Sequence, residues 1–320
     1  MHAIRIEQLT KDYGPVVALN GLDLTVEEGE VFGFLGPNGS GKTTTLRILM
    51  DLIRPTSGRA EILGFDTQRQ SIEVRARIGY LPDDPQMYDD MNVHAFLRLM
   101  ASLRGADGGN GGRPRHEQRR DELIERLQLD PTRRIGALSR GNRQKVGIVL
   151  ALMFEPPLVV ADEPTTGLDP LVREEVELIL REIAQQGGTV FFSSHVLGEV
   201  EQVCDRVAML REGRVIDVLV PAERRRLAPQ RFLVSFETAP PAGAFDGLPD
   251  VTVVSHDGTE AVLELVAGVD ALVKCLANFR VTHLETHEVS LEELFMSYYE
   301  PDSSDASPGT AADAAAGGQG

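Results

Sequence analysis

Apolar and polar residues alternate along the first thirty positions, which is the pattern of strands with one buried face. The alternating apolar positions are Ile4, Ile6 and Leu9, and then Leu22, Leu24 and Val26. Gly14 and Gly29 interrupt the pattern where turns are expected. The segment therefore predicts a small antiparallel sheet, and residues 59–68 predict a further short strand and a loop.

Continuous apolar runs follow, and such runs are typical of strands that are buried on both faces of a parallel sheet. These runs are Val31 to Leu35, Leu158 to Ala161 and Val190 to Phe192, and the residues from Ile78 to Leu81 predict a further strand. Between them lie segments with apolar residues at helical spacing, of which Thr43 to Leu52 is the first. Alternating strands and helices predict a core of the α/β class.

A mostly helical insert is expected at about residues 88–155. One helix should run from the cap Asn92 through Leu103, a second through Leu123 and a third over the apolar residues 146–154. Residues 105–112 are glycine-rich and precede several arginines. This stretch is either a solvated loop or a patch that contacts lipid headgroups.

The pattern changes again after Pro221. Residues 221–229 predict a linker after the first domain, 1–220. Residues 230–299 predict a small α+β domain with a hairpin turn at Asp257-Gly258 and a capping box at 290–293. Residues 300–320 are rich in Asp, Ser, Ala and Gly, and we expect this tail to be disordered.

The charge of the chain limits its partners. Its 49 acidic and 32 basic residues give a net charge of −17, which repels nucleic acid and anionic lipid surfaces. No apolar run approaches the ~20 residues that span a bilayer. The two cysteines, Cys204 and Cys275, lie far apart and without metal-ligand spacing. Reduced core thiols are expected in preference to a disulfide, which indicates the cytoplasm. A role at a membrane would therefore require a protein partner.

A phosphate-binding loop follows the first buried strand. It fits the pattern G-x-x-x-x-G-K-[ST] and comprises Gly36, Pro37, Asn38, Gly39, Ser40, Gly41, Lys42, Thr43 and Thr44. The glycines let backbone N–H groups turn inward, and the start of the next helix adds partial positive charge. Lys42 would reach the β- and γ-phosphates, and the Thr43 hydroxyl would bind Mg²⁺. The strand, loop and helix together predict a nucleotide site.

Carboxylates end another buried strand. Asp162 and Glu163 follow the run 158–161, and the carboxyl end of a parallel strand is where ligands gather. Each residue alone could be a turn residue, whereas together they suggest a magnesium ligand and a general base. Ser139 and Gly141 precede the helix at 146–154, where they form either a capping turn or a second anion site.

Taken in the order in which they occur along the chain, these elements resemble the ATP-binding subunit of an ABC transporter over about residues 1–220. The family has an aromatic loop, phosphate loop, Q-loop, signature, acidic strand end, D-loop and switch histidine. These elements are here Tyr13, Gly36–Thr44, Asp83, Leu138–Asn142, Asp162–Glu163, Asp169 and His195. The resemblance implies a P-loop NTPase of ABC type, with a mixed-sheet core, an antiparallel β subdomain and a helical subdomain. A small C-terminal α+β domain is added to it.

The resemblance also implies roles and cofactors, namely ATP and Mg²⁺. Asp162 would hold the metal through water, Glu163 would activate the attacking water, and His195 would fix the γ-phosphate. Tyr13 would stack on the base, although taken alone it also fits a packing role. Each ATP would lie between the phosphate loop of one subunit and the signature of a second. Signature residues Ser139, Gly141 and Asn142 would then face the γ-phosphate, and Asp169 would bridge the two sites.

Two positions depart from the family pattern. Asp83 stands where the family's usual Q-loop residue is glutamine, so a water-bridged metal contact is expected in place of a direct one. Asn142 ends the signature with a shorter amide side chain. Related subunits of the drug- and polysaccharide-export branch tolerate such changes, and many end in a segment like residues 290–295, which favours export.

The expected protein is therefore an ATPase subunit at the cytoplasmic face of the cell membrane. Its expected partners are an integral membrane permease and a second ATPase subunit, most simply an identical one, and nucleic acid is not expected. A soluble ABC ATPase in translation or DNA maintenance is the alternative, and its tandem nucleotide domains and long coiled coil are not seen in this sequence. A regulator that binds nucleotide without hydrolysis is a third interpretation, which the presence of Glu163 disfavours.

Overall fold

The computed structural model describes residues 1–105, 114–223, 230–265 and 268–288. It divides into two compact units, Met1–Leu227 and Ala228–Gly320. The division falls inside the segment 221–229, for which the sequence predicts a linker. The capping box at 290–293, the tail at 300–320 and most of the glycine-rich stretch 105–112 lie outside the described residues, so the expectations for them stay predictions.

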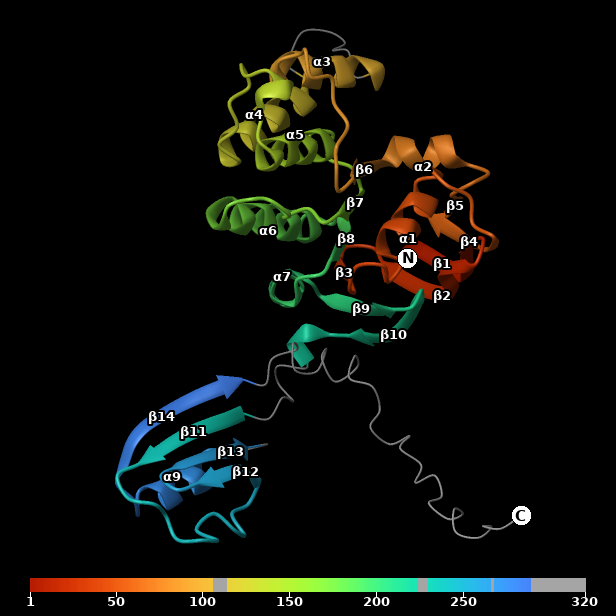
Figure 1. The fold of residues 1–320 in the computed structure, drawn as a ribbon. Helices are drawn as coiled ribbons and strands as arrows, with labels where there is room; N and C mark the ends of the chain where they lie inside the picture. Colours follow the sequence, from red (N-terminus) through yellow and green to blue (C-terminus); the bar gives the residue numbers. More distant parts are fainter. Residues whose placement is uncertain (106–113, 224–229, 266–267, 289–320) are drawn as a thin grey trace, which may run out of the picture. The chain divides into compact units, whose positions relative to one another are not determined.

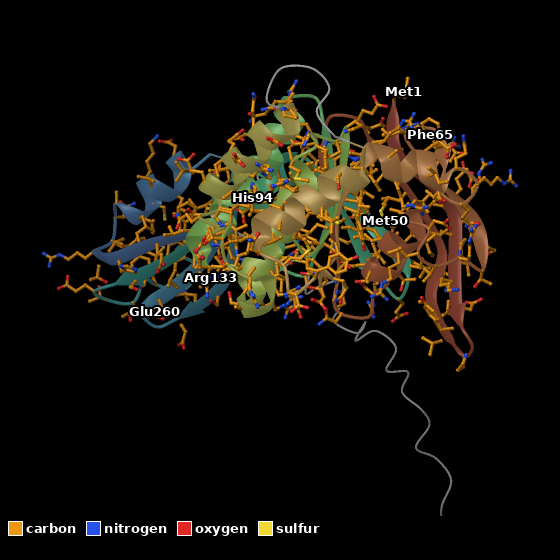
Figure 2. The ribbon with its side chains drawn as sticks, turned by 90° about the horizontal axis from the view of Figure 1, so that it is seen from above. Met1, Met50, Phe65, His94, Arg133 and Glu260 are labelled. Carbon is orange, nitrogen blue, oxygen red and sulfur yellow. The ribbon has the colours of Figure 1, made fainter. Side chains whose placement is uncertain are left out.

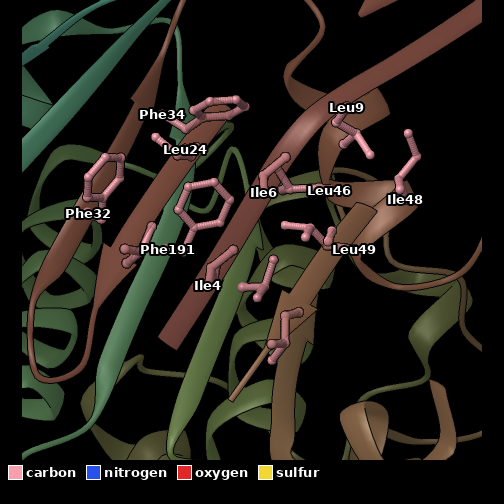
Figure 3. Packing of buried hydrophobic residues seen from close by; sticks show 14 of the residues in the cluster. Ile4, Ile6, Leu9, Leu24, Phe32, Phe34, Leu46, Ile48, Leu49 and Phe191 are labelled. Carbon is pink, nitrogen blue, oxygen red and sulfur yellow. The ribbon is translucent and has the colours of Figure 1, made fainter. Parts of the chain in front are cut away.

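The first unit begins with an antiparallel sheet of four strands in the order β2-β1-β4-β5. Its strands are β1 (His2–Tyr13), β2 (Val16–Glu27), β4 (Ser57–Ile62) and β5 (Phe65–Asp66). All neighbouring strands run antiparallel, as the alternation of apolar positions predicts. The buried residues of β1 include Ile4, Ile6 and Leu9, whose side chains all face the core (Figure 3).

A six-stranded sheet forms the centre of this unit, in the order β10-β9-β3-β8-β7-β6. Its strands are β3 (Val31–Leu35), β6 (Ile78–Leu81), β7 (Leu158–Asp162), β8 (Thr189–Ser194), β9 (Arg206–Arg211) and β10 (Arg214–Leu219). The sheet is parallel except for β10, which pairs antiparallel with β9. The prediction of a mixed-sheet α/β core is confirmed. Strands β9 and β10 were not predicted.

Helices and the antiparallel sheet cover the two faces of this central sheet (Figure 1). Helix α1 (Lys42–Leu49) and the antiparallel sheet share one core with Phe32, Phe34 and Phe191 of the central strands (Figure 3). Helices α6 (Pro170–Gln185) and α7 (Leu197–Val203) lie on the other side. Helix α1 ends three residues earlier than the predicted Leu52, because the backbone turns into the left-handed region at Asp51, where φ is 56°. A short helix that was not predicted, α2 (Ser71–Arg77), precedes β6.

The chain between β6 and β7 is mostly helical. It contains α3 (Val93–Leu103), α4 (Arg115–Arg126), the 3₁₀ turn η1 (Ile135–Ala137) and α5 (Arg140–Leu152). The Asn92 side chain accepts a hydrogen bond from Ala95 N at 2.7 Å, which is the predicted cap of α3. His94 N donates to Pro131 O at 3.0 Å, so the start of α3 lies against the segment that carries Arg133 (Figure 2).

The second unit has one antiparallel sheet in the order β12-β13-β11-β14. Its elements are β11 (Gln230–Phe236), β12 (Val251–Asp257), β13 (Glu260–Leu265), α9 (Asp270–Leu276) and β14 (Val281–Glu288). Leu272 and Leu276 of α9 pack with Phe232, Val234 and Phe236 of β11 in a separate core. The unit is thus α+β, with a hairpin where Asp257-Gly258 predicts it. Within the described parts of both units, every helix is too short or too polar to cross a bilayer.

Candidate nucleotide-binding site

A cavity of about 480 Å³ lies where the strands β3, β7 and β8 end. Residues 37–39 and 41–44 of the phosphate loop form one wall of the cavity. Residues 16–18 of β2 also line it. The remaining lining residues are Asp83, Arg140, Glu163, Thr166 and His195. The fold therefore brings six separate stretches of the chain to one cavity, at the edge of the sheet where the sequence predicts a nucleotide.

Gly41 shows why the phosphate loop needs glycine. Its φ of 111° is outside the range that other residues adopt readily. A Cβ atom at this position would lie 2.7 Å from Leu19 Cδ2 and 2.8 Å from Ala18 O, so the loop packs directly against β2. Helix α1 starts at the next residue, and the first N–H groups of a helix have no intrahelical acceptor. These groups and the helix dipole suit an anion such as phosphate.

Lys42 is held inside this loop and is only 6% exposed. Its Nζ donates to Gly36 O at 2.6 Å and to Pro37 O at 3.3 Å, and it lies 3.6 Å from Glu163 Oε1. Burial lowers the pKa of Lys42, an effect that the nearby carboxylates of Glu163 and Asp162 oppose. The lysine therefore supplies a cation that is already oriented at the phosphate loop.

Glu163 adopts an uncommon backbone conformation, with φ at 52°. Its N–H group lies within hydrogen-bond distance of Ser193 O at 3.2 Å and Ser193 Oγ at 3.1 Å. On the other side, the Gln144 side chain donates to Glu163 O at 3.2 Å and to Pro164 O at 3.3 Å. These contacts hold the backbone in a conformation that glutamate does not favour by itself.

The Glu163 side chain meets the predicted switch histidine. His195 Nδ1 lies 2.7 Å from Glu163 Oε2, and Thr166 Oγ1 donates to the same oxygen at 3.4 Å. Glu163 is mostly buried, whereas the His195 side chain is half exposed at the cavity. A carboxylate and an imidazole in contact can accept and hold a proton, which is the requirement for general base catalysis.

Asp162 is buried beside this pair and is 1% exposed. Ser193 Oγ donates to Asp162 Oδ1 at 2.5 Å. Burial, together with the Asp162 charge, raises the pKa of Tyr80 to about 12. Among the described residues no group of three metal-ligating side chains occurs. This donor set still fits Mg²⁺, which usually takes one or two carboxylates together with substrate phosphates.

Asp83 lines the cavity, but its carboxylate is engaged with an arginine. Arg140 Nη2 donates to Asp83 Oδ1 at 3.3 Å, and both side chains are substantially exposed. Sequence reasoning did not place Arg140 in the site. The two residues are 57 positions apart, and only the packing of α5 against β6 and its following loop brings them together.

The signature residues lie at the start of α5. Ser139 Oγ accepts from Asn142 N at 3.3 Å and from Asn142 Nδ2 at 3.1 Å, so it caps the helix. Gly141 lies against the turn before α6, because a Cβ atom there would be 2.4 Å from Gly167 O. Asp169 caps α6 by accepting from Val172 N at 3.1 Å. None of Ser139, Gly141, Asn142 and Asp169 is among the residues that line the cavity.

Four further candidate residues lie outside the cavity wall, namely Asp162, Tyr13, Gly36 and Ser40. Tyr13 is 48% exposed, and Lys11 Nζ lies 5.0 Å from the centroid of its ring. Gly36 and Ser40 belong to the phosphate loop without lining the cavity. Within the described part of the chain, the buried Ser40 Oγ has no hydrogen-bond partner. Strand β2 contributes Val16 and Val17 to the wall.

Comparisons with known proteins agree with this geometry. The family model described as ABC transporter matches residues 19–166. The bacitracin transport ATP-binding protein BcrA of Bacillus licheniformis is 36% identical over 217 residues, which are 67% of this chain and 68% of that protein. The chain belongs to the ABC transporter ATP-binding proteins. Members of this family are ATPases, so this chain is an ATPase as well.

Two further ABC proteins resemble this one. The daunorubicin resistance ATP-binding protein DrrA3 of Streptomyces coeruleorubidus is 40% identical over 216 residues, 67% of each chain. The dimeric structure of MJ0796, a bacterial ABC transporter cassette, matches with a TM-score of 0.61 and 26% identity, over 68% of this chain and 98% of that one. The similarity to both covers about two thirds of this chain, which agrees with an ABC cassette joined to an additional unit.

Proposed function

We propose that this chain hydrolyses ATP to drive an export permease in the membrane. The observation that carries the proposal is the contact between Glu163 and His195 beside Lys42, in one cavity with the phosphate loop. Relatives named for bacitracin transport and daunorubicin resistance support export as the direction of transport. The chain would bind the permease at the cytoplasmic face, because its net charge of −17 disfavours direct adsorption to anionic lipid.

In this proposal the phosphates lie along the loop at residues 37–44. Backbone N–H groups at the start of α1 and the Lys42 ammonium bind them through charge-assisted hydrogen bonds. A phosphate beside Lys42 would attract the ammonium more strongly than the Glu163 carboxylate does at 3.6 Å. Glu163 would then remain paired with His195 and accept a proton from the attacking water. His195 uses Nδ1 for this contact, so Nε2 is left for the γ-phosphate.

Mg²⁺ would neutralise charge on the β- and γ-phosphates. The Thr43 hydroxyl and the Asp162 carboxylate are the groups that would hold it. Asp83 would contribute through water, as its ion pair with Arg140 occupies one carboxylate oxygen. The chain's own task is to orient Asp162, and the Ser193 hydroxyl does this from the neighbouring strand.

A second copy of the chain would complete each site. Ser139, Gly141 and Asn142 lie outside the cavity of their own chain, and the α5 N-terminus they form is suited to phosphate. The dimeric cassette MJ0796 supports a dimer of this kind. In such a dimer the signature of one chain would meet the γ-phosphate bound by the other, and Asp169 would lie between the two sites.

The decisive experiment is purification of the tagged chain from detergent-solubilised membranes, followed by identification of bound proteins. We expect an integral membrane protein with about six apolar segments of ~20 residues. ATP hydrolysis by the purified complex should be abolished by Glu163→Gln. Recovery with ribosomes or nucleoid, without such a protein, would support the alternative of a soluble ABC ATPase and contradict the proposal.

A further inference from the structure

Glu199 is a buried carboxylate close to the nucleotide site that no motif includes. It lies on α7, four residues after His195, and is 8% exposed. Its Oε2 accepts hydrogen bonds from Thr165 Oγ1 at 2.8 Å and from Ser194 Oγ at 3.1 Å. A buried charge is costly unless hydrogen bonds and an opposite charge offset its desolvation. Here two hydroxyl groups donate to one carboxylate oxygen and so offset part of this cost.

These two hydroxyls belong to the loops that carry Glu163 and His195. Thr165 is two residues after Glu163, and Ser194 directly precedes His195. Ser194 Oγ also accepts a hydrogen bond from Val196 N at 2.9 Å. This hydroxyl therefore links the residues directly before and after His195. Because Glu163 and His195 touch at 2.7 Å, the contacts form a closed ring through both loops. Within this ring, Glu199 links the two loops through the hydrogen bonds at its Oε2.

We infer that Glu199 is a positioning residue for the Glu163–His195 pair. This inference rests on the proposed roles of these two residues in hydrolysis. Glu199 does not line the cavity, so it acts on ATP only through the geometry of the loops. It holds Thr165 and Ser194 at a common oxygen and so fixes the separation of the ends of β7 and β8. Displacing catalytic groups by about 1 Å costs roughly 10²-fold in rate.

Two further charged residues near Glu199 lie on α6. Arg173 Nε lies 3.5 Å from Glu199 Oε1, on a side chain that is 39% exposed. Burial, followed by the charge of Glu199, raises the pKa of Glu177. The ion pair with Arg173 is at Oε1, whereas the two hydroxyls bind Oε2. The positioning role therefore requires an acceptor oxygen at Oε2, which glutamine also supplies, and does not require the negative charge.

The experiment compares Glu199→Ala and Glu199→Gln in the full-length protein, with steady-state ATP hydrolysis and ATP titration. Alanine should lower kcat by about 10- to 100-fold and leave KM and the ATP dissociation constant within about threefold. Glutamine should restore kcat to within about threefold of the wild type. Glu177→Gln is the matched control, since it removes a neighbouring buried carboxylate that is outside the ring, and its kcat should stay unchanged.

Thr165→Val and Ser194→Ala delete one hydroxyl each and decide the question if Glu199→Ala does not fold. Each should lower kcat with ATP affinity retained, and hydrogen exchange should accelerate at residues 163–167 and 193–198. The inference is overturned if the folded variants keep the wild-type kcat, if KM rises in step with the loss, or if glutamine is as defective as alanine. Glu163→Gln, measured in parallel, distinguishes failure of this inference from failure of the proposed function. Full activity of Glu163→Gln would overturn the proposed roles of Glu163 and His195.

Discussion

Gly141 offers a test of how closely the signature packs in a single chain. A Cβ atom at this position would lie 2.4 Å from Gly167 O, whereas ordinary carbon–oxygen contacts are about 3.3 Å or longer. The obstructing atom is backbone, so it cannot rotate away as a side chain would. In Gly141→Ala, the start of α5 and the turn before α6 must therefore separate by roughly 1 Å.

This strain should destabilise the folded protein by about 1–3 kcal/mol, which is the usual cost of overpacking. The matched control is Gly198→Ala, because no described atom outside its own helix lies within 4 Å of a Cβ atom there and the residue is in the first turn of α7. Alanine in a helix is favoured over glycine by up to about 1 kcal/mol, so this control should be neutral or stabilised. Both free energies of unfolding come from denaturant titrations of the full-length protein.

The same variant separates stability from nucleotide binding. Gly141 does not line the cavity of its own chain, so ATP affinity of the folded monomer should change by less than about threefold. If Gly141→Ala unfolds at the same denaturant concentration as the wild type, the close contact with Gly167 is not present in solution. The described packing of α5 against the turn before α6 would then be wrong.

Three further variants test the nucleotide site. Glu163→Gln should reduce ATP turnover by about 10²- to 10⁴-fold and leave ATP titration unchanged, because it removes only the general base; near-normal phosphate release would exclude that role. Lys42→Ala should weaken binding of ATP more than that of AMP, and an equal loss in the two titrations would show that the lysine is not at the β- and γ-phosphates. Asp83→Asn should change the free energy of unfolding by less than about 1 kcal/mol, because its ion pair with Arg140 is exposed. A larger loss in denaturant titration would make that pair a structural contact.

Much of the first unit could be predicted because its signals are local. The apolar run at 31–35 and the helical spacing after Lys42 each specify one element, and the phosphate loop lies between them. Asn92 and Ser139 cap helices where their sequence context indicates. Strands β9 and β10 carry a similar signal, an apolar run and an alternating run on either side of Glu212-Gly213, but were not predicted. The polar ends of the strands could be assigned to one site because parallel strands end at the same edge of a sheet.

The rest of the site depends on long-range contacts that no local pattern specifies. The meeting of Arg140 with Asp83 requires α5 to pack beside β6, and it changes Asp83 from a simple candidate metal ligand into half of an ion pair. Gln144 and Glu199 are polar residues within helices, where a solvated position is usual, yet both are buried. The roles of the predicted site residues, including that of Tyr13, stay predictions.

Glu163 shows how such unpredicted residues determine the chemistry. A left-handed backbone at a residue other than glycine costs on the order of 1–3 kcal/mol, so an isolated turn would relax to another conformation. Ser193 lies against its N–H group and Gln144 binds its carbonyl, and neither residue belongs to the same strand or turn. Ser193 also donates to Asp162, so one hydroxyl contacts both adjacent acids. The orientation of the proposed base thus depends on β8 and α5 as much as on the acidic strand end. Substitutions at Ser193 or Gln144, which are distant in sequence, should therefore affect hydrolysis more than nucleotide binding.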